Sequence, residues 1–161
     1  MKFFTPFIIA GALLFAAPVM AQETAGSGGN TNMEILLQKV KADKKLLVAG
    51  NMDLSDAEGK NFWPIYDNYQ KELDQINQRL GKTIMEYADA FNKGPIPNDT
   101  AKKLLNDVLT IEEAEIKLKR TYADKVGKVL SPAKTARYIQ IENKIRALLK
   151  MELAANIPLV Y

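Results

Sequence analysis

The 161-residue sequence contains no cysteine and no histidine. Without cysteine no disulfide can brace an exported chain, so it must be held together by packing alone. Without histidine the chain lacks the commonest metal ligand and the side chain that most often exchanges protons near neutral pH. These absences argue against a zinc, nickel or copper site, and we expect no cofactor. Calcium or magnesium bound by carboxylates stays open, although no acidic cluster has the spacing of a calcium loop.

Motifs that specify a reaction are also missing. The sequence has no glycine-rich loop of the phosphate-binding type. Ser55 and Ser131 have no histidine partner, and each precedes a helical pattern, so we interpret both as helix caps rather than nucleophiles.

Acidic and basic side chains follow one another closely in the third helical pattern: Glu112, Glu113, Glu115, Lys117, Lys119 and Arg120. Neighbouring acids on one helix point in different directions, and bases follow them directly. The run therefore favours a solvated charged face over a catalytic carboxylate pair. We expect that the protein is not an enzyme.

The first 21 residues have the pattern of a secretory signal peptide. Lys2 precedes an apolar run over 3–17, and the small residue Ala21 marks the expected cleavage site. A membrane anchor is the alternative, but the apolar run is short for a membrane span and Pro18 follows it directly. The pattern predicts a periplasmic protein without stable membrane insertion after cleavage.

The mature chain is nearly balanced in charge. Cleavage removes one charged residue, Lys2, from a chain of formal net charge +3. Residues 22–32 are small, polar and rich in glycine, and they predict a flexible tail. Basic residues over 39–45 could favour nucleic acid, but Asp43 interrupts them and export argues against it. We expect no nucleic-acid partner.

From residue 33 onward, apolar residues recur with helical spacing in four stretches, and no strand-like alternation is present. The sequence therefore predicts an all-α fold with one domain over 33–161. We expect the first helix to end at Gly50-Asn51. The second and third should run about 30 residues each, roughly 45 Å at 1.5 Å per residue, and form a long antiparallel hairpin. The breakers over 94–97 separate these two helices.

Two of the helix starts are specified by capping residues. The Ser55 side chain can accept a hydrogen bond from the backbone N–H of Glu58, and the Glu58 side chain can reach back to the N–H of Ser55. For the third helix, Asn98 or Asp99 is the expected cap.

The fourth helix is predicted to begin after Ser131, with Pro132 at the first helical position, and to end near Asn156. An apolar C-terminal tail follows: Ile157, Pro158, Leu159, Val160 and Tyr161. We expect this tail to pack back onto the helices or across a dimer interface.

A proline lies inside the second helical pattern, surrounded by aromatic residues. The group consists of Phe62, Trp63, Pro64, Tyr66 and Tyr69. Because Pro64 has no N–H and its ring clashes with the carbonyl of Lys60, it predicts a kink. The aromatic residues either fill the inside of the kink as core, or line a concave exposed surface for client or partner proteins.

The second and fourth helix starts match each other at a fixed offset along the chain. The matched pairs are Leu54 with Leu130, Ser55 with Ser131, Ala57 with Ala133, and Phe62 with Tyr138. Similar capping chemistry at two helix starts accounts for such a match as readily as a true repeat does.

Paired Leu-Ser helix starts in a small exported all-helical chain resemble the Spy/CpxP-like periplasmic proteins, which carry paired LTxxQ motifs. The stretches "FWPIYDNYQKEL" and "ARYIQIENKIRALL" are also similar to stretches of exported bacterial proteins of that kind. The resemblance covers residues 54–158. At the glutamine places of the motif, this chain has Glu58 and Lys134.

The resemblance implies a cradle of long helices, often a homodimer. Such a cradle holds unfolded proteins in the envelope without ATP, or acts as an adaptor in the envelope stress response. The metal chemistry of some relatives does not carry over, because this chain has neither histidine nor cysteine. The alternative is a structural or interaction protein with one specific envelope partner and no general chaperone activity.

Overall fold

The computed structural model of the chain describes residues 43–160. The predicted signal peptide, the predicted tail over 22–32 and the start of the first predicted helix lie outside this range. The chain divides into two compact units between Asp53 and Leu54. A helical stretch over 43–52 belongs to the first unit, and three longer helices belong to the second.

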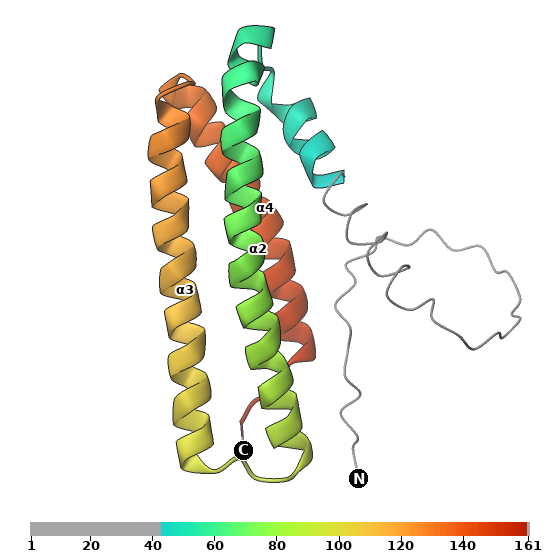
Figure 1. Cartoon of the computed structure of the whole chain (residues 1–161). Coiled ribbons are helices and arrows are strands. Elements are labelled where there is room, and N and C mark those ends of the chain that lie inside the picture. Colours follow the sequence, from blue (N-terminus) through green and yellow to red (C-terminus); the bar gives the residue numbers. More distant parts are fainter. Residues whose placement is uncertain (1–42, 161) are drawn as a thin grey trace, which may run out of the picture. The chain divides into compact units, whose positions relative to one another are not determined.

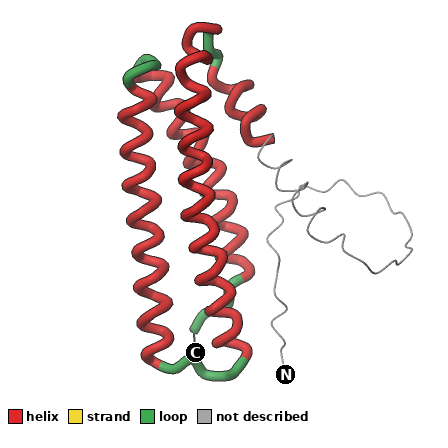
Figure 2. Tube along the Cα trace, in the orientation of Figure 1, coloured by secondary structure: helices red, strands yellow, loops and turns green. Residues whose placement is uncertain are grey.

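The fold is all-α, as predicted. The second unit contains α2 (Asp56–Asn92), α3 (Asn98–Gly127) and α4 (Pro132–Asn156), and no strand occurs anywhere in 43–160. Helices α2 and α3 form the long antiparallel hairpin, and α4 returns along it in the same direction as α2 (Figure 1). Short loops join the three helices (Figure 2). In the loop after α2, Gly94 has a φ of 122°, which glycine adopts at little cost.

The start of α2 follows the prediction. The Ser55 side chain accepts from the Glu58 N–H at 3.3 Å, and the Glu58 carboxylate accepts from the Ser55 N–H at 2.9 Å. At the start of α4, Ser131 accepts from the Lys134 N–H at 3.3 Å, with Pro132 as the first helical residue. Both serines are therefore N-caps. Helix α4 ends at Asn156, also as predicted.

The expected cap of α3 is wrong. Pro97 occupies the N-cap position, and no side chain of Asn98 or Asp99 caps the helix. The proline ring holds φ at −59°, so the chain enters the helix in a fixed direction, and the Pro97 carbonyl accepts from Ala101 N–H at 2.9 Å. Rigid backbone geometry therefore replaces side-chain capping at this end.

The expected end of the first helix at Gly50-Asn51 is also wrong. The helical stretch continues through Met52. The Asn51 side chain donates to the Leu47 carbonyl at 2.8 Å, which keeps Asn51 within the helix. The chain leaves the helix at Asp53, whose φ of 47° lies in the left-handed region that aspartate tolerates better than most residues.

Helix α2 continues through Pro64 without interruption, and Pro64 is exposed. The bend expected at Pro64 stays a prediction. The core of the second unit follows the predicted apolar stripes of α2 and α3. Its fully or nearly buried members are Phe62, Tyr66, Tyr69, Leu73, Ile76, Ala88, Leu104, Ile111, Leu118, Tyr122, Val126, Leu130 and Tyr138.

Candidate functional site

Glu58 and Lys134, which stand at equivalent positions in the starts of α2 and α4, bind each other. The Lys134 ammonium donates to the Glu58 carboxylate at 2.7 Å, joining the first turns of α4 and α2. Because Lys134 and then the Ser55 N–H donate to this carboxylate, the pKa of Glu58 falls to about 2. Lys134 thus supplies an ionic partner for the Glu58 carboxylate, which also caps α2.

The matched aromatic pair also meets. The rings of Phe62 and Tyr138 lie 5.1 Å apart at 86°, an edge-to-face contact. Glu58 and Lys134, and likewise Phe62 and Tyr138, are equivalent positions in the two helix starts. The first turns of α2 and α4 therefore lie level with each other, with equivalent residues facing.

The aromatic residues round Pro64 are mostly core. Phe62 is fully buried, and Tyr66 and Tyr69 are each 2% exposed, so of the two predicted alternatives these three residues are core and do not form an exposed client surface. Trp63 is half-buried and contacts Phe62 edge-on at 5.0 Å, while Pro64 is exposed. Rings from all three helices enclose the buried residues, because Tyr122 of α3 and Tyr138 of α4 pack against Tyr69. The aromatic cluster stabilises the helix junction.

A buried ion pair lies deeper in the bundle. Arg146 of α4 donates through Nε to Glu115 of α3 at 2.8 Å, and its Nη2 donates to the same oxygen. Its Nη1 donates to the Asn77 side chain of α2 at 2.8 Å. Glu115 is 6% exposed, so the expected solvated face is wrong at this residue, although Glu112 and Glu113 are exposed. Arg146 links all three helices through its fork of donors.

A second buried acid, Glu142, lies between this ion pair and the tyrosines. Gln70 donates to Glu142 at 2.9 Å, and Glu142 is 3% exposed. Burial, and then the charge of Glu142, raise the pKa of Tyr66, Tyr69 and Tyr138. The Tyr138 hydroxyl is buried beside the Glu142 carboxylate.

These polar groups connect the three helices of the second unit. Arg146 neutralises Glu115, and Gln70 bonds Glu142, so both acids have fixed partners away from solvent. Within the part of the chain that the structure describes, no group of three or more acids could hold a metal ion.

Sequence reasoning missed this network, although a signal was present for one member. Glu115 lies on the apolar stripe of α3, four residues after Ile111 and three before Leu118. An acid at such a position faces the core and needs a partner there. No residue near Glu115 in the sequence indicated that its partner would be Arg146, which lies on α4.

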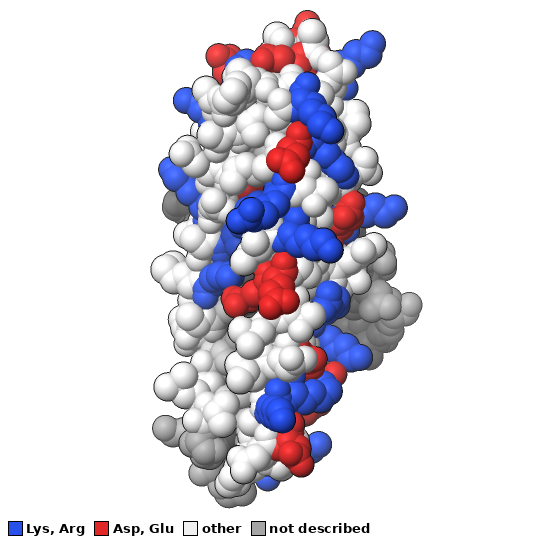
Figure 3. Space-filling view, turned by 90° about the vertical axis from the view of Figure 1, so that its left-hand side faces the viewer, with Lys and Arg blue, Asp and Glu red and all other residues white. Residues whose placement is uncertain are grey.

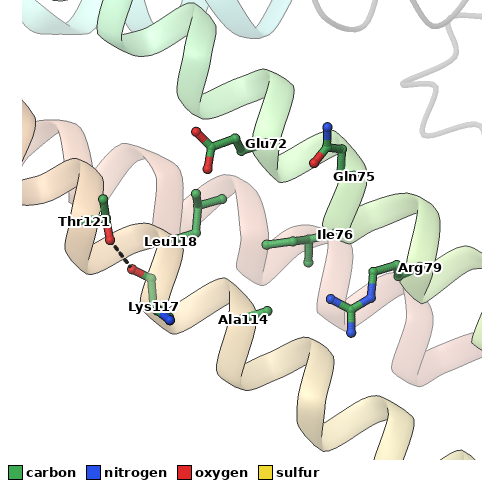
Figure 4. Close-up of a pocket in the computed structure, with 8 residues that line it drawn as sticks. All are labelled: Glu72, Gln75, Ile76, Arg79, Ala114, Lys117, Leu118 and Thr121. Carbon is green, nitrogen blue, oxygen red and sulfur yellow. Dashed lines mark hydrogen bonds between the residues drawn. The ribbon is translucent and has the colours of Figure 1, made fainter.

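An open depression of about 310 Å³ lies between α2 and α3 (Figure 4). It is lined by Glu72, Gln75, Ile76, Arg79, Ala114, Lys117, Leu118 and Thr121. Glu72 is the acidic residue of this depression, and its carboxylate accepts a hydrogen bond from the Tyr122 hydroxyl at 2.5 Å. Burial first, and then this bond, raise the pKa of Tyr122 to about 12. Its basic residues, Arg79 and Lys117, are exposed, and none of its lining residues has a buried polar side-chain atom without a hydrogen-bond partner.

The C-terminal tail packs back along part of its length, as expected. Tyr87 of α2 donates to the Pro158 carbonyl at 2.8 Å, and Ile157 and Pro158 are half-buried. Leu159 and Val160 are 88% and 57% exposed, so they do not dock. Tyr161 lies outside the described residues.

Large apolar side chains are exposed on each helix of the second unit: Met85 on α2, Leu105, Leu109 and Ile116 on α3, and Leu148 and Met151 on α4. No helix found between residues 43 and 160 has the length and apolar character needed to cross a membrane. Comparison with models of protein families, with curated proteins and with solved structures finds no match to this chain.

Proposed function

We propose that this chain is an exported binding protein that holds other polypeptides on exposed apolar helical side chains, as an ATP-independent periplasmic chaperone or an envelope-stress adaptor. One observation carries the proposal. Met85, Leu148 and Met151 are 68%, 65% and 66% exposed, although the bundle has a buried aromatic core. Side chains of this size and exposure serve contact with another molecule better than they serve the fold.

The three residues lie along the same part of α2 and α4, between two hydrogen bonds of α2 with α4 and the tail that follows it. Helices α2 and α4 run in the same direction, and two hydrogen bonds tie them at known positions. The Asn77–Arg146 bond lies on one side of Met85, Leu148 and Met151 along the helices, and the Tyr87–Pro158 bond lies on the other. We call these three residues the α2/α4 apolar group.

The chemistry of this group suits varied partners. Methionine is unbranched and polarizable, so its side chain adapts to apolar surfaces of different shapes. Two of the three residues are methionines, and each stands near charged neighbours in sequence, such as Glu86 and Lys150. Charged neighbours keep such a surface soluble when no client is bound.

A single specific partner is the second candidate. The burial of Phe62, Tyr66 and Tyr69 favours it, because it removes the broad aromatic surface that general holding of unfolded chains would use. What remains exposed is a small set of aliphatic and thioether groups.

An aggregation assay separates the two candidates. Several unrelated denatured proteins are diluted with and without the purified mature chain, and light scattering is followed. General holding predicts lower scattering for every client without ATP. One specific partner predicts unchanged scattering for all of them. Export is tested separately by N-terminal sequencing of the periplasmic protein, which should begin at Gln22.

A further inference from the structure

Methionine is the only sulfur-containing residue type of this chain, because the sequence has no cysteine. Within residues 43–160 the methionines are Met52, Met85 and Met151. Met85 on α2 and Met151 on α4 are 68% and 66% exposed, whereas Met52 is fully buried. Both exposed thioethers belong to the α2/α4 apolar group, so a reagent that modifies them changes that group directly.

The side chains that usually compete for an oxidant are absent or covered. A cysteine thiolate would react with a peroxide ahead of a thioether, and the sequence has none. Every aromatic residue of 43–160 is buried or half-buried. The exposed thioethers of Met85 and Met151 are therefore the side chains of the described residues that are most open to oxidation.

Surface charge does not restrict access to these sulfur atoms. Figure 3 shows Lys, Arg, Asp and Glu side chains interspersed with uncharged ones over one face of the molecule. Met85 stands in sequence between Lys82 and Glu86, which form an ion pair at 4.0 Å. Such charges steer charged molecules, but hydrogen peroxide is uncharged. The exposure of each sulfur atom therefore decides how fast it reacts.

We propose that Met85 and Met151 are modification sites for hydrogen peroxide, and that their oxidation releases polypeptides from the α2/α4 apolar group. A lone pair of the sulfur attacks one peroxide oxygen, and the S–O bond forms as the O–O bond breaks. The departing hydroxide takes the proton of the transferred oxygen and leaves as water. The sulfur thus loses two electrons to the peroxide and becomes a sulfoxide. The release, unlike the modification, rests on the function proposed above.

The sulfoxide changes the binding group without changing the fold. Oxidation turns a flexible apolar side chain into a polar one, which weakens contact with apolar partners. Two of the three members of the group change in this way, and Leu148 alone stays apolar. Because Met85 and Met151 are exposed, their sulfoxides stay in water, whereas a sulfoxide at the buried Met52 would lose its hydration. The modification is reversible, since methionine sulfoxide reductases restore the thioether.

Peptide mass spectrometry tests the modification sites without any client. The mature chain is treated with hydrogen peroxide and digested with trypsin, which puts Met52, Met85 and Met151 in separate peptides. The peptides of Met85 and Met151 should each gain one oxygen atom while helicity stays unchanged. The Met52 peptide should react about tenfold more slowly or less, because a buried sulfur reacts only when the structure opens locally. In urea the three rates should converge. Equal rates at Met52 and Met85 in the folded chain would overturn the proposal.

The aggregation assay, run before and after peroxide treatment, tests the release. Oxidised wild type should need about tenfold more protein for the same suppression of scattering, and reduction by methionine sulfoxide reductases should reverse this. Met85→Leu/Met151→Leu is the matched control, because leucine keeps the apolar volume and resists peroxide. It retains the other methionines and should suppress equally before and after treatment. Oxidised wild type as effective as untreated, or a leucine variant that loses suppression equally, would overturn the release.

Failure of this inference differs from failure of the proposed function. An untreated wild type that does not suppress scattering contradicts the proposed function and with it the release. The peptide masses still decide whether Met85 and Met151 are the modification sites.

Discussion

Glu58 and Lys134 occupy equivalent positions in the two helix starts of the bundle, and they bind each other at 2.7 Å. The contact ties the first turn of α4 to the first turn of α2, next to the edge-to-face contact of Phe62 and Tyr138. A helix cap and an interhelical bridge therefore share one carboxylate. The corner of the bundle depends on the ionised form of Glu58.

Because Glu58 stabilises the fold in its ionised form, the free energy of unfolding should depend on pH in the acid range. Its pKa is about 2 in the folded chain, against 4.5 for an ordinary glutamate, so the folded state binds its proton less readily than the unfolded state. The stabilisation is present above pH 4.5 and is lost as pH falls toward 2. Urea unfolding as a function of pH should show this decline in the wild type and a smaller one in Glu58→Gln. Asp56→Asn is the control and should keep the wild-type decline. Parallel curves for wild type and Glu58→Gln would contradict the role of this pair.

The buried ion pair should be far more costly to break than an exposed one on the same helices. Arg146→Met leaves Glu115 charged and nearly buried with only Lys119, at 3.9 Å, as an ionic partner, and we expect a loss of about 3 kcal/mol in the free energy of unfolding. Lys150→Met removes the exposed bridge to Glu112 and should cost about 1 kcal/mol or less. Pairing Arg146→Met with Glu115→Leu should recover most of the loss. Chemical denaturation measures all three variants, and equal losses for Arg146→Met and Lys150→Met would refute the buried network.

The buried tyrosines should resist alkali until the bundle opens. Burial and nearby acids raise the pKa of Tyr66, Tyr69 and Tyr138, and that of Tyr122 reaches about 12, against 10.0 for an ordinary tyrosine. Because the folded state holds these protons more tightly, its stability falls as pH rises above 10. Tyrosinate absorbance should rise for these four residues together with loss of helicity. The chain in urea should titrate near the ordinary value, and coincident native and denatured curves would contradict the burial.

A substitution at Pro64 tests whether the aromatic group serves only as core. Pro64→Ala restores an N–H for the Lys60 carbonyl inside a continuous helix and should stabilise the chain by about 1 to 3 kcal/mol. Asn68→Ala, one turn further on, is the control and should gain only a few tenths of a kcal/mol. Because the rings are buried, aggregation suppression should not change. A variant that folds but holds clients less well would restore the concave surface as a hypothesis.

Short-range features of this fold were predictable from the sequence. The capping box of Ser55 and Glu58 lies within one helical turn, and so does the start of α4 at Ser131 and Pro132. Their geometry depends on neighbours in the chain, which a sequence shows directly. The predicted cap of α3 was wrong because Pro97, which precedes Asn98 and Asp99, fixes the backbone at the start of the helix.

Long-range pairings were not predictable in the same way. The partner of Glu115 lies 31 residues away on α4, and that of Glu58 lies 76 residues away. An apolar stripe shows which side chains avoid water, but it does not show whether another helix covers them. For that reason the stripe of Phe62, Tyr66 and Tyr69 was compatible with both core and binding surface until α4 was placed against it.

The central claim is that the exposed α2/α4 apolar group binds other polypeptides. The most direct test compares the mature wild type with Leu148→Ser/Met151→Ser at equal dose in the aggregation assay, with Asn143→Ser/Lys144→Ser on α4 as the matched control. The account predicts that the wild type and the control suppress scattering, and that the apolar variant loses suppression while its melting temperature stays unchanged. A wild type that leaves scattering unaltered, or an apolar variant as effective as the wild type, would contradict it.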